Sequence, residues 1–381
     1  MASIVETAPL VLNIGVVLGA AATMGFAARK VGLPSVIGYL ATGLLVSPFT
    51  PGFVADNNQL ALLADIGIVL LLFEVGIELD LRKIGREKRA LLWNVPAQMG
   101  FGVLVGTPIF LWLGVPLFGS LLLSLSVAMS SSVVIVNITR SPRRRTDTST
   151  EEALLGWSLI QDLVGVAAAA VILTLFGNAE KPLVVAIGGL FAFSGIAIVA
   201  SKILPKVLQA VRWDRDLFLI YSVSFGLVLA ALGTVLFDIP MALAGFVAGL
   251  AINQSRDTED VRKAILPFRD LFAVLFFVVV GTLIQPSAVI EAVPFAALVL
   301  LLMVLLKTFP TMLLARVGKM KVRHSLLGIG VSQIGEFSFV LSSLAFAQGE
   351  ISSSQYTGVL LAVVLSISGS TILVRLAPKK G

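Results

Sequence analysis

The stretch WSLIQDLVGV, residues 157–166, places a carboxylic acid in the middle of a long apolar run. If the run crosses a bilayer, Asp162 lies near the midplane, where a helix-centre Asp costs about 2.5–3.5 kcal/mol on insertion scales. On a helix, Ser158 precedes Asp162 by one turn, and Gln161 and Gly165 flank the same face. These residues offer hydroxyl, amide and carboxylate oxygens, which suit an alkali cation or a proton. The alternative is a buried aspartate that neighbouring helices satisfy structurally.

The composition of the chain indicates an all-α polytopic membrane protein. Of its 381 residues, 57% are hydrophobic and 13% charged, and the mean hydropathy is +1.00. A soluble domain carries about a quarter charged residues. The chain has no cysteine and a single histidine, His324, which excludes disulfides, thiol chemistry and a His-cluster zinc site. We find no nucleophile–base–orienter set either, so we expect a secondary transporter without a cofactor and not an enzyme.

The apolar runs predict about thirteen transmembrane helices, several of them near the length of about 20 residues that a crossing needs. The second and ninth runs are short and contain glycine, so they are candidates for tilted or broken helices. The expected spans are 9–28, 33–47, 60–77, 90–113, 117–137, 152–176, 182–201, 217–236, 240–253, 266–284, 292–315, 324–347 and 355–375.

The basic residues predict the orientation of these helices. Nearly all of the 28 Lys and Arg fall in loops that would share one side of the membrane. The opposite loops hold only Lys181, and Lys307 lies inside a run. By the positive-inside rule, the N-terminus is then outside and the C-terminus is in the cytoplasm, in a multi-pass protein of the cell membrane. We interpret the basic residues as topology determinants that face the lipid bilayer surface, and not as a nucleic-acid surface.

Thirteen runs allow two six-helix repeats of opposite orientation around a linker helix. Runs five and twelve then correspond, and both carry small polar residues at mid-depth. Such residues allow a membrane helix to unwind where it lines a cavity, and opposed half-helices at the midplane are typical of ion sites in secondary transporters. We therefore expect two crossing broken helices, the alternative being close packing through small residues. The residues concerned are Ser130, Ser131 and Ser132 in run five, and Ser332, Gln333 and Glu336 in run twelve.

Further charges lie inside the predicted membrane spans. Lys307 is in mid-span and needs a carboxylate partner, for which Asp162 and Glu336 are candidates; it serves either as a structural counter-charge or in the proton path. Pro310 is expected to distort the helix nearby. Asp65 lies near the outer end of the third run, where it could line an outer funnel.

Several motifs resemble the monovalent cation:proton antiporter-2 family, over nearly the whole chain. GYLATGLL at 38–45, followed by Pro48, resembles its second-helix signature, and GIVLLLFEVGIEL at 67–79 resembles its third-helix motif. Ser130–Val133 and VSQIGEFSFVL at 331–341 are similar to its two crossing helices. The Gln161-Asp162 pair is closest to the Kef-type potassium/proton antiporters, which share it.

This resemblance implies a sodium/proton-antiporter-like fold and a homodimer of two-domain protomers. A dimer or scaffold part would come from about 1–80 and 217–284, with 182–201 as the linker helix, and a core ion-transport part from about 90–176 and 292–375. The resemblance also implies that Asp162 holds the cation or proton, that Gln161 shapes selectivity and that Lys307 lies near Asp162.

Kef-type chains usually continue into a cytoplasmic nucleotide-binding regulatory domain. The printed sequence ends at 378–381 without a G-x-G-x-x-G strand–helix unit. We therefore expect either an antiporter not regulated by that route, or a regulatory domain or separate regulatory subunit that this sequence does not include.

Together, these patterns predict an antiporter that exchanges a monovalent cation for H⁺ at Asp162 by alternating access. Because Gln161 is neutral, Asp162 alone supplies charge from its helix, which favours one-for-one, electroneutral exchange. A single carboxylate with amide and hydroxyl oxygens is a weak field, which favours K⁺ over Na⁺, although Na⁺ stays possible. The alternatives are a sodium-coupled organic solute symporter, and a channel or sensor on a transporter scaffold.

Overall fold

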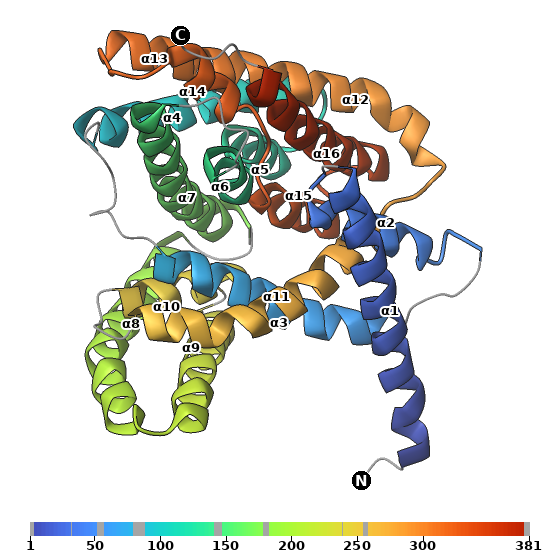
Figure 1. The fold of residues 1–381 in the computed structure, drawn as a ribbon, viewed down its shortest axis with the longest axis vertical. Coiled ribbons are helices and arrows are strands. Elements are labelled where there is room, and N and C mark those ends of the chain that lie inside the picture. Colours follow the sequence, from blue (N-terminus) through green and yellow to red (C-terminus); the bar gives the residue numbers. More distant parts are fainter. Residues whose placement is uncertain are drawn as a thin grey trace. The chain divides into compact units, whose positions relative to one another are not determined.

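The chain folds as a series of helices in a computed structural model, which describes residues 4–31, 33–51, 57–78, 88–140, 147–177, 183–237, 239–253 and 258–376. Many of the basic loop residues that predict the orientation, and the C-terminal residues 378–381, lie outside these ranges. The helices are α1 (Ile4–Lys30), α2 (Ser35–Leu45), α3 (Asn57–Glu78), α4 (Lys88–Trp112), α5 (Leu117–Ala128), α6 (Ser132–Arg140), α7 (Thr148–Phe176), α8 (Leu183–Val211), α9 (Arg215–Phe237), α10 (Met241–Asn253), α11 (Thr258–Thr282), α12 (Ala288–Met303), η2 (Val304–Thr308), α13 (Phe309–Val317), α14 (His324–Gly330), α15 (Phe337–Ala347) and α16 (Ser353–Leu376) (Figure 1).

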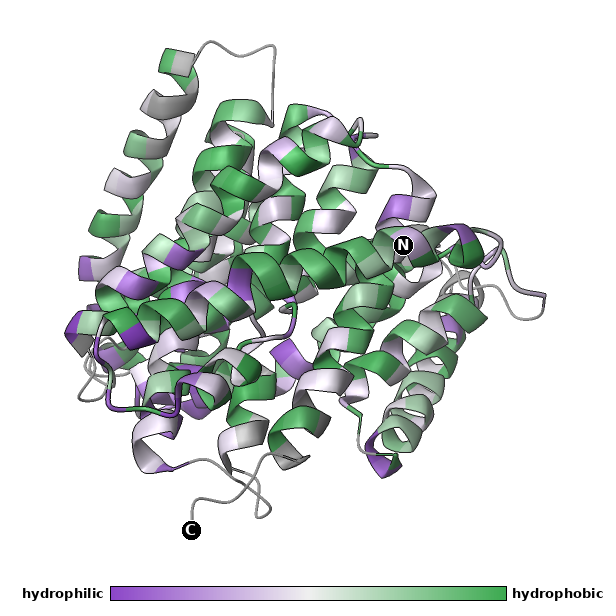
Figure 2. Ribbon diagram, turned by 90° about the horizontal axis from the view of Figure 1, so that it is seen from above, coloured by the Kyte–Doolittle hydropathy of each residue, from purple (hydrophilic) through white to green (hydrophobic). Residues whose placement is uncertain are grey.

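All thirteen predicted runs contain a helix, and two of them are divided. The run 117–137 forms α5 and α6, and the run 324–347 forms α14 and α15, so both expected interruptions are present. The run 292–315 forms α12, the π-helical turn η2 and α13. By length and composition, eight helices of the described residues can cross a membrane. Figure 2 shows hydrophobic residues along most of the ribbon.

Two predicted helix boundaries are wrong. We expected the tenth span to begin at about 266, whereas α11 begins at Thr258 and carries Glu259 and Asp260 in its first turn. Acidic residues there stabilise the positive end of the helix dipole, so the helix extends beyond the apolar segment that hydropathy detects. The linker helix α8 likewise continues past 201, to Val211.

The helices form two units, which are described separately. Unit 1 comprises Met1–Leu79 and Leu173–Pro286, and unit 2 comprises Asp80–Ile172 and Ser287–Gly381. Each unit therefore draws helices from both halves of the sequence. The linker helix α8 belongs to unit 1. The roles expected for the two parts, scaffold and ion transport, stay a prediction.

Unit 1 contains two equivalent glycine crossings. Gly43 of α2 meets Gly281 of α11, and a Cβ on Gly43 would lie 2.7 Å from the Cα of Gly281. Gly76 of α3 meets Gly249 of α10 in the same way, at 2.9 Å. The helices α2 and α10 come from runs two and nine, and α3 and α11 come from runs three and ten. Each helix of one crossing therefore has its counterpart in the other crossing seven runs away, as an inverted repeat requires. Glycine permits this close backbone approach, which drives helix association in a bilayer.

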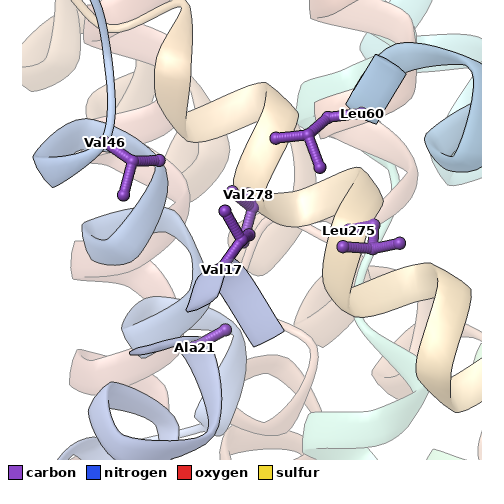
Figure 3. Packing of buried hydrophobic residues seen from close by; sticks show 6 residues of the cluster. All are labelled: Val17, Ala21, Val46, Leu60, Leu275 and Val278. Atoms are coloured by element: carbon purple, nitrogen blue, oxygen red, sulfur yellow. The ribbon is translucent and has the colours of Figure 1, made fainter. Parts of the chain in front are cut away.

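Apolar and ionic contacts complete the packing of unit 1. Figure 3 shows a buried cluster that joins α1, α3 and α11, with one residue that follows α2. Near the other end of α3, the buried carboxylate of Glu74 accepts hydrogen bonds from Arg262 (2.8 Å) and Arg269 (3.0 Å) of α11. Both arginines are partly exposed and satisfy both carboxylate oxygens of Glu74, which allows the acid to be buried. The cluster comprises Val17, Ala21, Val46, Leu60, Leu275 and Val278.

Unit 2 packs around the two divided spans. The helix α5 contacts α4 and α15, and α16 lies along α12 (Figure 1). One face of α4 carries Gly102 and Gly106, which approach Ala128 and Ser124 of α5. The G-x-x-x-G spacing in α4 is therefore a site of close helix packing.

Candidate functional site

The interruptions of the two divided spans lie against each other in unit 2. We call residues 129–131 the first break and residues 331–336 the second break. The backbone N–H of Gly335 donates to the carbonyl of Met129 at 3.1 Å. A Cβ on Gly335 would lie 2.6 Å from the carbonyl oxygen of Ser130, closer than real side chains approach. The glycine therefore allows the two backbones to touch where neither is helical.

Serine side chains add hydrogen bonds to backbone carbonyls at the breaks. Ser130 Oγ donates to the carbonyl of Val331 at 2.8 Å and so links the two breaks directly. Ser332 Oγ donates to Ile329 O at 2.9 Å, within the span 324–347 that contains the second break. Short hydroxyl side chains compete with helical hydrogen bonding in this way, which explains why these serine-rich segments unwind.

Lys307, in the span 292–315, connects the two breaks. Its side chain is completely buried, and Nζ donates to the carbonyls of Met129 (2.8 Å) and Gln333 (2.6 Å). Met129 follows the last residue of α5, and Gln333 follows α14 closely. The ammonium therefore lies at the C-terminal ends of two half-helices, where the helix dipole favours a cation. The predicted carboxylate partner of Lys307 stays a prediction.

The span of Lys307 is distorted at that residue. The π-helical turn Val304–Thr308 precedes Pro310, and Phe309 N donates to Val304 O, five residues earlier. Proline has no N–H and cannot make the hydrogen bond to the carbonyl of Leu306 that an α-helix needs. Leu306 O instead accepts a hydrogen bond from Gln98 Nε2 of α4 at 3.3 Å. Single π-helical turns often occur at functional sites.

The predicted ion-site helix is α7. Asp162 is buried, with 5% of its surface exposed, and Ser158 one turn earlier is buried as well. Gly165, on the adjacent turn, leaves room for the side chain of Met129 from the first break. Ser158 Oγ and Gln333 Oε1 are buried oxygens without a hydrogen-bond partner in the part of the chain that the structure describes. Most buried polar atoms in proteins are satisfied, so these two oxygens are available to a bound group.

The neighbour of Asp162, Gln161, is bound to the first break. Gln161 Nε2 donates to the carbonyl of Ala128 at 2.7 Å and to Gln98 Oε1 at 3.1 Å. Its Oε1 accepts from the backbone N–H of Ser130 at 3.0 Å. Both N–H groups of the amide are therefore used. An equivalent contact exists at the second break, where Ile334 N donates to Ser366 Oγ of α16 at 3.0 Å.

The remaining predicted residues are placed differently. Ser131 is buried and accepts a hydrogen bond from Val134 N at 3.3 Å, at the start of α6, where Ser132 is half-buried. Glu336 is half-buried and immediately precedes α15. Asp65 is exposed on α3 and belongs to unit 1. Among the described residues, no group of three or more His, Cys, Asp or Glu side chains could hold a metal ion.

Sequence reasoning missed two residues of this region. Gln98 and Ser366 are buried polar residues that bind the residues around the breaks. The available signal was a polar side chain within an otherwise apolar span, which in a membrane is a candidate for a specific partner.

A helical membrane protein with two interrupted helices in mutual contact has the architecture of a secondary transporter. Solved structures share the fold. The sodium proton antiporter MjNhaP1 from Methanocaldococcus jannaschii at pH 8 superimposes with a TM-score of 0.74 at 18% identity, over 96% of this chain and 98% of that one. An electron-microscopy map of the same antiporter matches with a TM-score of 0.64, over 96% and 94%.

The sequence gives the family. Residues 16–377 match the sodium/hydrogen exchanger family over its transmembrane region, and the chain belongs to that family. The chain is also 31% identical over 386 aligned positions to the protein named "Putative cation/proton antiporter YbaL" of Escherichia coli (strain K12), covering 97% of this chain and 69% of that protein. The relatives are cation/proton antiporters, so the chain is a multi-pass membrane protein of an antiporter family.

Proposed function

We propose that the chain exchanges a monovalent cation for a proton at Asp162 by alternating access. The observation that carries this proposal is the attachment of the Gln161-Asp162 pair to the first break, where Gln161 binds both Ala128 O and Ser130 N. This attachment holds the segment of α7 that carries the buried Asp162 against an interrupted helix. Interrupted helices supply backbone oxygens and half-helix ends to ions at mid-membrane.

Competition at one carboxylate is enough for exchange. Asp162 holds a proton in one half-cycle and a cation, when ionised, in the other. Ser158 Oγ and Gln333 Oε1 are candidates for neutral ligands, because they are buried oxygens without a partner among the described residues. Ser130, Ser131, Ser132 and Ser332 shape the breaks around the site. Gln161 influences selectivity through the backbone of the first break, since its amide hydrogens are both engaged.

The charge count favours electroneutral exchange. Gln161 is neutral, so one cation or one proton balances Asp162, provided that Lys307 keeps its proton throughout. One carboxylate with hydroxyl and amide oxygens forms a weaker field than two carboxylates. Such a field selects the ion that loses its water more easily, which favours K⁺ over Na⁺.

We also propose how the protein is arranged around this reaction. Unit 2 is the moving core, and unit 1 is the scaffold through which two copies form a homodimer, with Asp65 in an outer funnel. The N-terminus faces outward and the C-terminus lies in the cytoplasm of a cell membrane. A regulatory domain or separate regulatory subunit could act from the cytoplasmic side. No nucleic acid takes part.

The test is cation-driven proton flux in proteoliposomes with an internal pH dye. We expect K⁺ to drive flux at lower concentration than Na⁺, without a steady current in solid-supported membrane recordings. Asp162→Asn should abolish exchange while the purified protein keeps its thermal stability, and Asp216→Asn, an exposed control in α9, should behave as wild type. Absence of exchange with every monovalent cation would refute the function. Normal exchange by Asp162→Asn would refute the site, and a steady current would refute electroneutrality.

A further inference from the structure

A chain of side-chain amides joins three spans of unit 2. Gln98 of α4 is completely buried; its Nε2 donates to Leu306 O, and its Oε1 accepts from Gln161 Nε2. Gln161 in turn binds the first break at Ala128 O and Ser130 N. Gln98 therefore lies between the span of Lys307 and the helix of Asp162.

The orientation of both amides is fixed by backbone groups. Leu306 O and Ala128 O can only accept a hydrogen bond, and Ser130 N can only donate one. If the Gln161 amide flipped, its NH₂ group would face the N–H of Ser130. If the Gln98 amide flipped, its oxygen would face Leu306 O. The chain of hydrogen bonds thus has one direction, from the break through Gln161 and Gln98 to Leu306.

The last hydrogen bond of this amide series, from Gln98 to Leu306 O, depends on a proline. Pro310 has no N–H, so Leu306 O lacks the hydrogen bond that an α-helix would give it. Gln98 supplies that bond from another helix, directly beside the π-helical turn that carries Lys307. The same side chain therefore satisfies the distorted turn and orients Gln161.

We propose that Gln98 is a positioning residue for the exchange reaction. Gln98 adds a third hydrogen bond to the Gln161 amide in the orientation that binds Ser130 N, and it couples this amide to the span of Lys307. Removal of Gln98 leaves an N–H of Gln161 and the carbonyl of Leu306 without these partners, and the first break loosens beside Asp162. This inference rests on the proposed exchange at Asp162.

The helix α4 offers a matched control. Asn94 lies one turn before Gln98, is also buried, and donates from Nδ2 to Leu314 O of α13 at 3.2 Å. Asn94 thus ties α4 to the span of Lys307 as Gln98 does. None of the hydrogen bonds that the structure gives Asn94 involves Gln161. Asn94→Leu therefore removes a comparable buried amide without disturbing the orientation of Gln161.

The experiment measures the half-saturating K⁺ concentration and the maximal rate of exchange in proteoliposomes. For Gln98→Met, which keeps the side-chain length, we expect the half-saturating concentration to rise about fivefold or more, as for the loss of one net hydrogen bond, with a smaller change in maximal rate. Asn94→Leu should leave the half-saturating concentration within about twofold of the wild-type value, because a residue outside the Gln98–Gln161 network should not be coupled to it. Gln98→Asn, whose amide is one methylene too short to make both contacts, should change it in the same direction if Gln98→Met does not fold.

A double substitution separates positioning from general packing. K⁺-dependent thermal stabilisation of the purified protein gives binding even when transport is lost. If Gln98 acts through Gln161, Gln98→Met should not weaken K⁺ binding further in a Gln161→Met background. Additive effects, an unchanged half-saturating concentration in Gln98→Met and Gln98→Asn, or an equal rise in Asn94→Leu would overturn the inference. Absence of exchange in the wild type would instead refute the proposed function.

Discussion

Replacement of Lys307 by methionine tests whether its ammonium holds the two breaks together. Methionine keeps the length of the side chain but removes the hydrogen bonds to Met129 O and Gln333 O. A hydrogen bond to a charged group contributes about 1.5–3 kcal/mol, so the gross loss is about 3–6 kcal/mol. Met129 O keeps its bond from Gly335 N, and removal of a buried charge returns several kcal/mol of desolvation cost. We therefore expect a net destabilisation of about 1–3 kcal/mol.

The assay is thermal unfolding of purified Lys307→Met in detergent, with exchange measured at several pH values. A unit of this size changes its melting temperature by about 2–4 °C per kcal/mol, so we expect a fall of about 2–12 °C. Lys202→Met, an exposed control in α8, should melt as wild type. A variant that melts normally but shifts the pH dependence of exchange would show that Lys307 carries a proton and does not act as a structural counter-charge. If stability and pH profile were both unchanged, Lys307 would have neither role.

The remaining predictions concern close contacts. Gly335→Ala should destabilise the protein by about 1–3 kcal/mol, as overpacking does, and abolish exchange, because its Cβ would meet Ser130 O. Gly369→Ala in α16, with open space around it, should melt no lower than wild type, and equal behaviour of the two variants would contradict the reasoning. Glu74→Gln weakens the ion pairs with Arg262 and Arg269 and should lower the free energy of unfolding by about 1–3 kcal/mol, since both arginines retain access to solvent. The melting temperature should fall accordingly, and unchanged melting would show that these pairs do not stabilise unit 1.

Local sequence patterns predicted the two breaks because their cause is local. Clusters of serine and glycine supply the hydroxyls and the close approach that an unwound helix needs, and Ser130 and Gly335 have these uses in the structure. The distortion expected near Pro310 is also present, as the π-helical turn before it. A proline and its missing N–H can be read directly from the sequence.

The partners of Gln98 and Lys307 could not be predicted in this way. Gln98 binds Gln161, 63 positions later, and Leu306, 208 positions later. Hydropathy detects an amphipathic or apolar helix but does not indicate which polar side chains meet across three spans. The two hydrogen bonds of Lys307 described above go to backbone carbonyls, and the carboxylate partner that we expected stays a prediction. Backbone acceptors leave no residue-specific signal, since every non-terminal residue provides one.

These carbonyls bear on the stoichiometry that we propose. The C-terminal end of a helix carries about −0.5 elementary charge, and Lys307 binds carbonyls at or just beyond the ends of two helices, α5 and α14. Together, the two ends amount to about one negative charge, which matches the ammonium. The ends of the broken helices can therefore contribute to balancing the charge of Lys307. In the exchange that we propose, Asp162 alternates between one proton and one cation, which is the condition for one-for-one exchange.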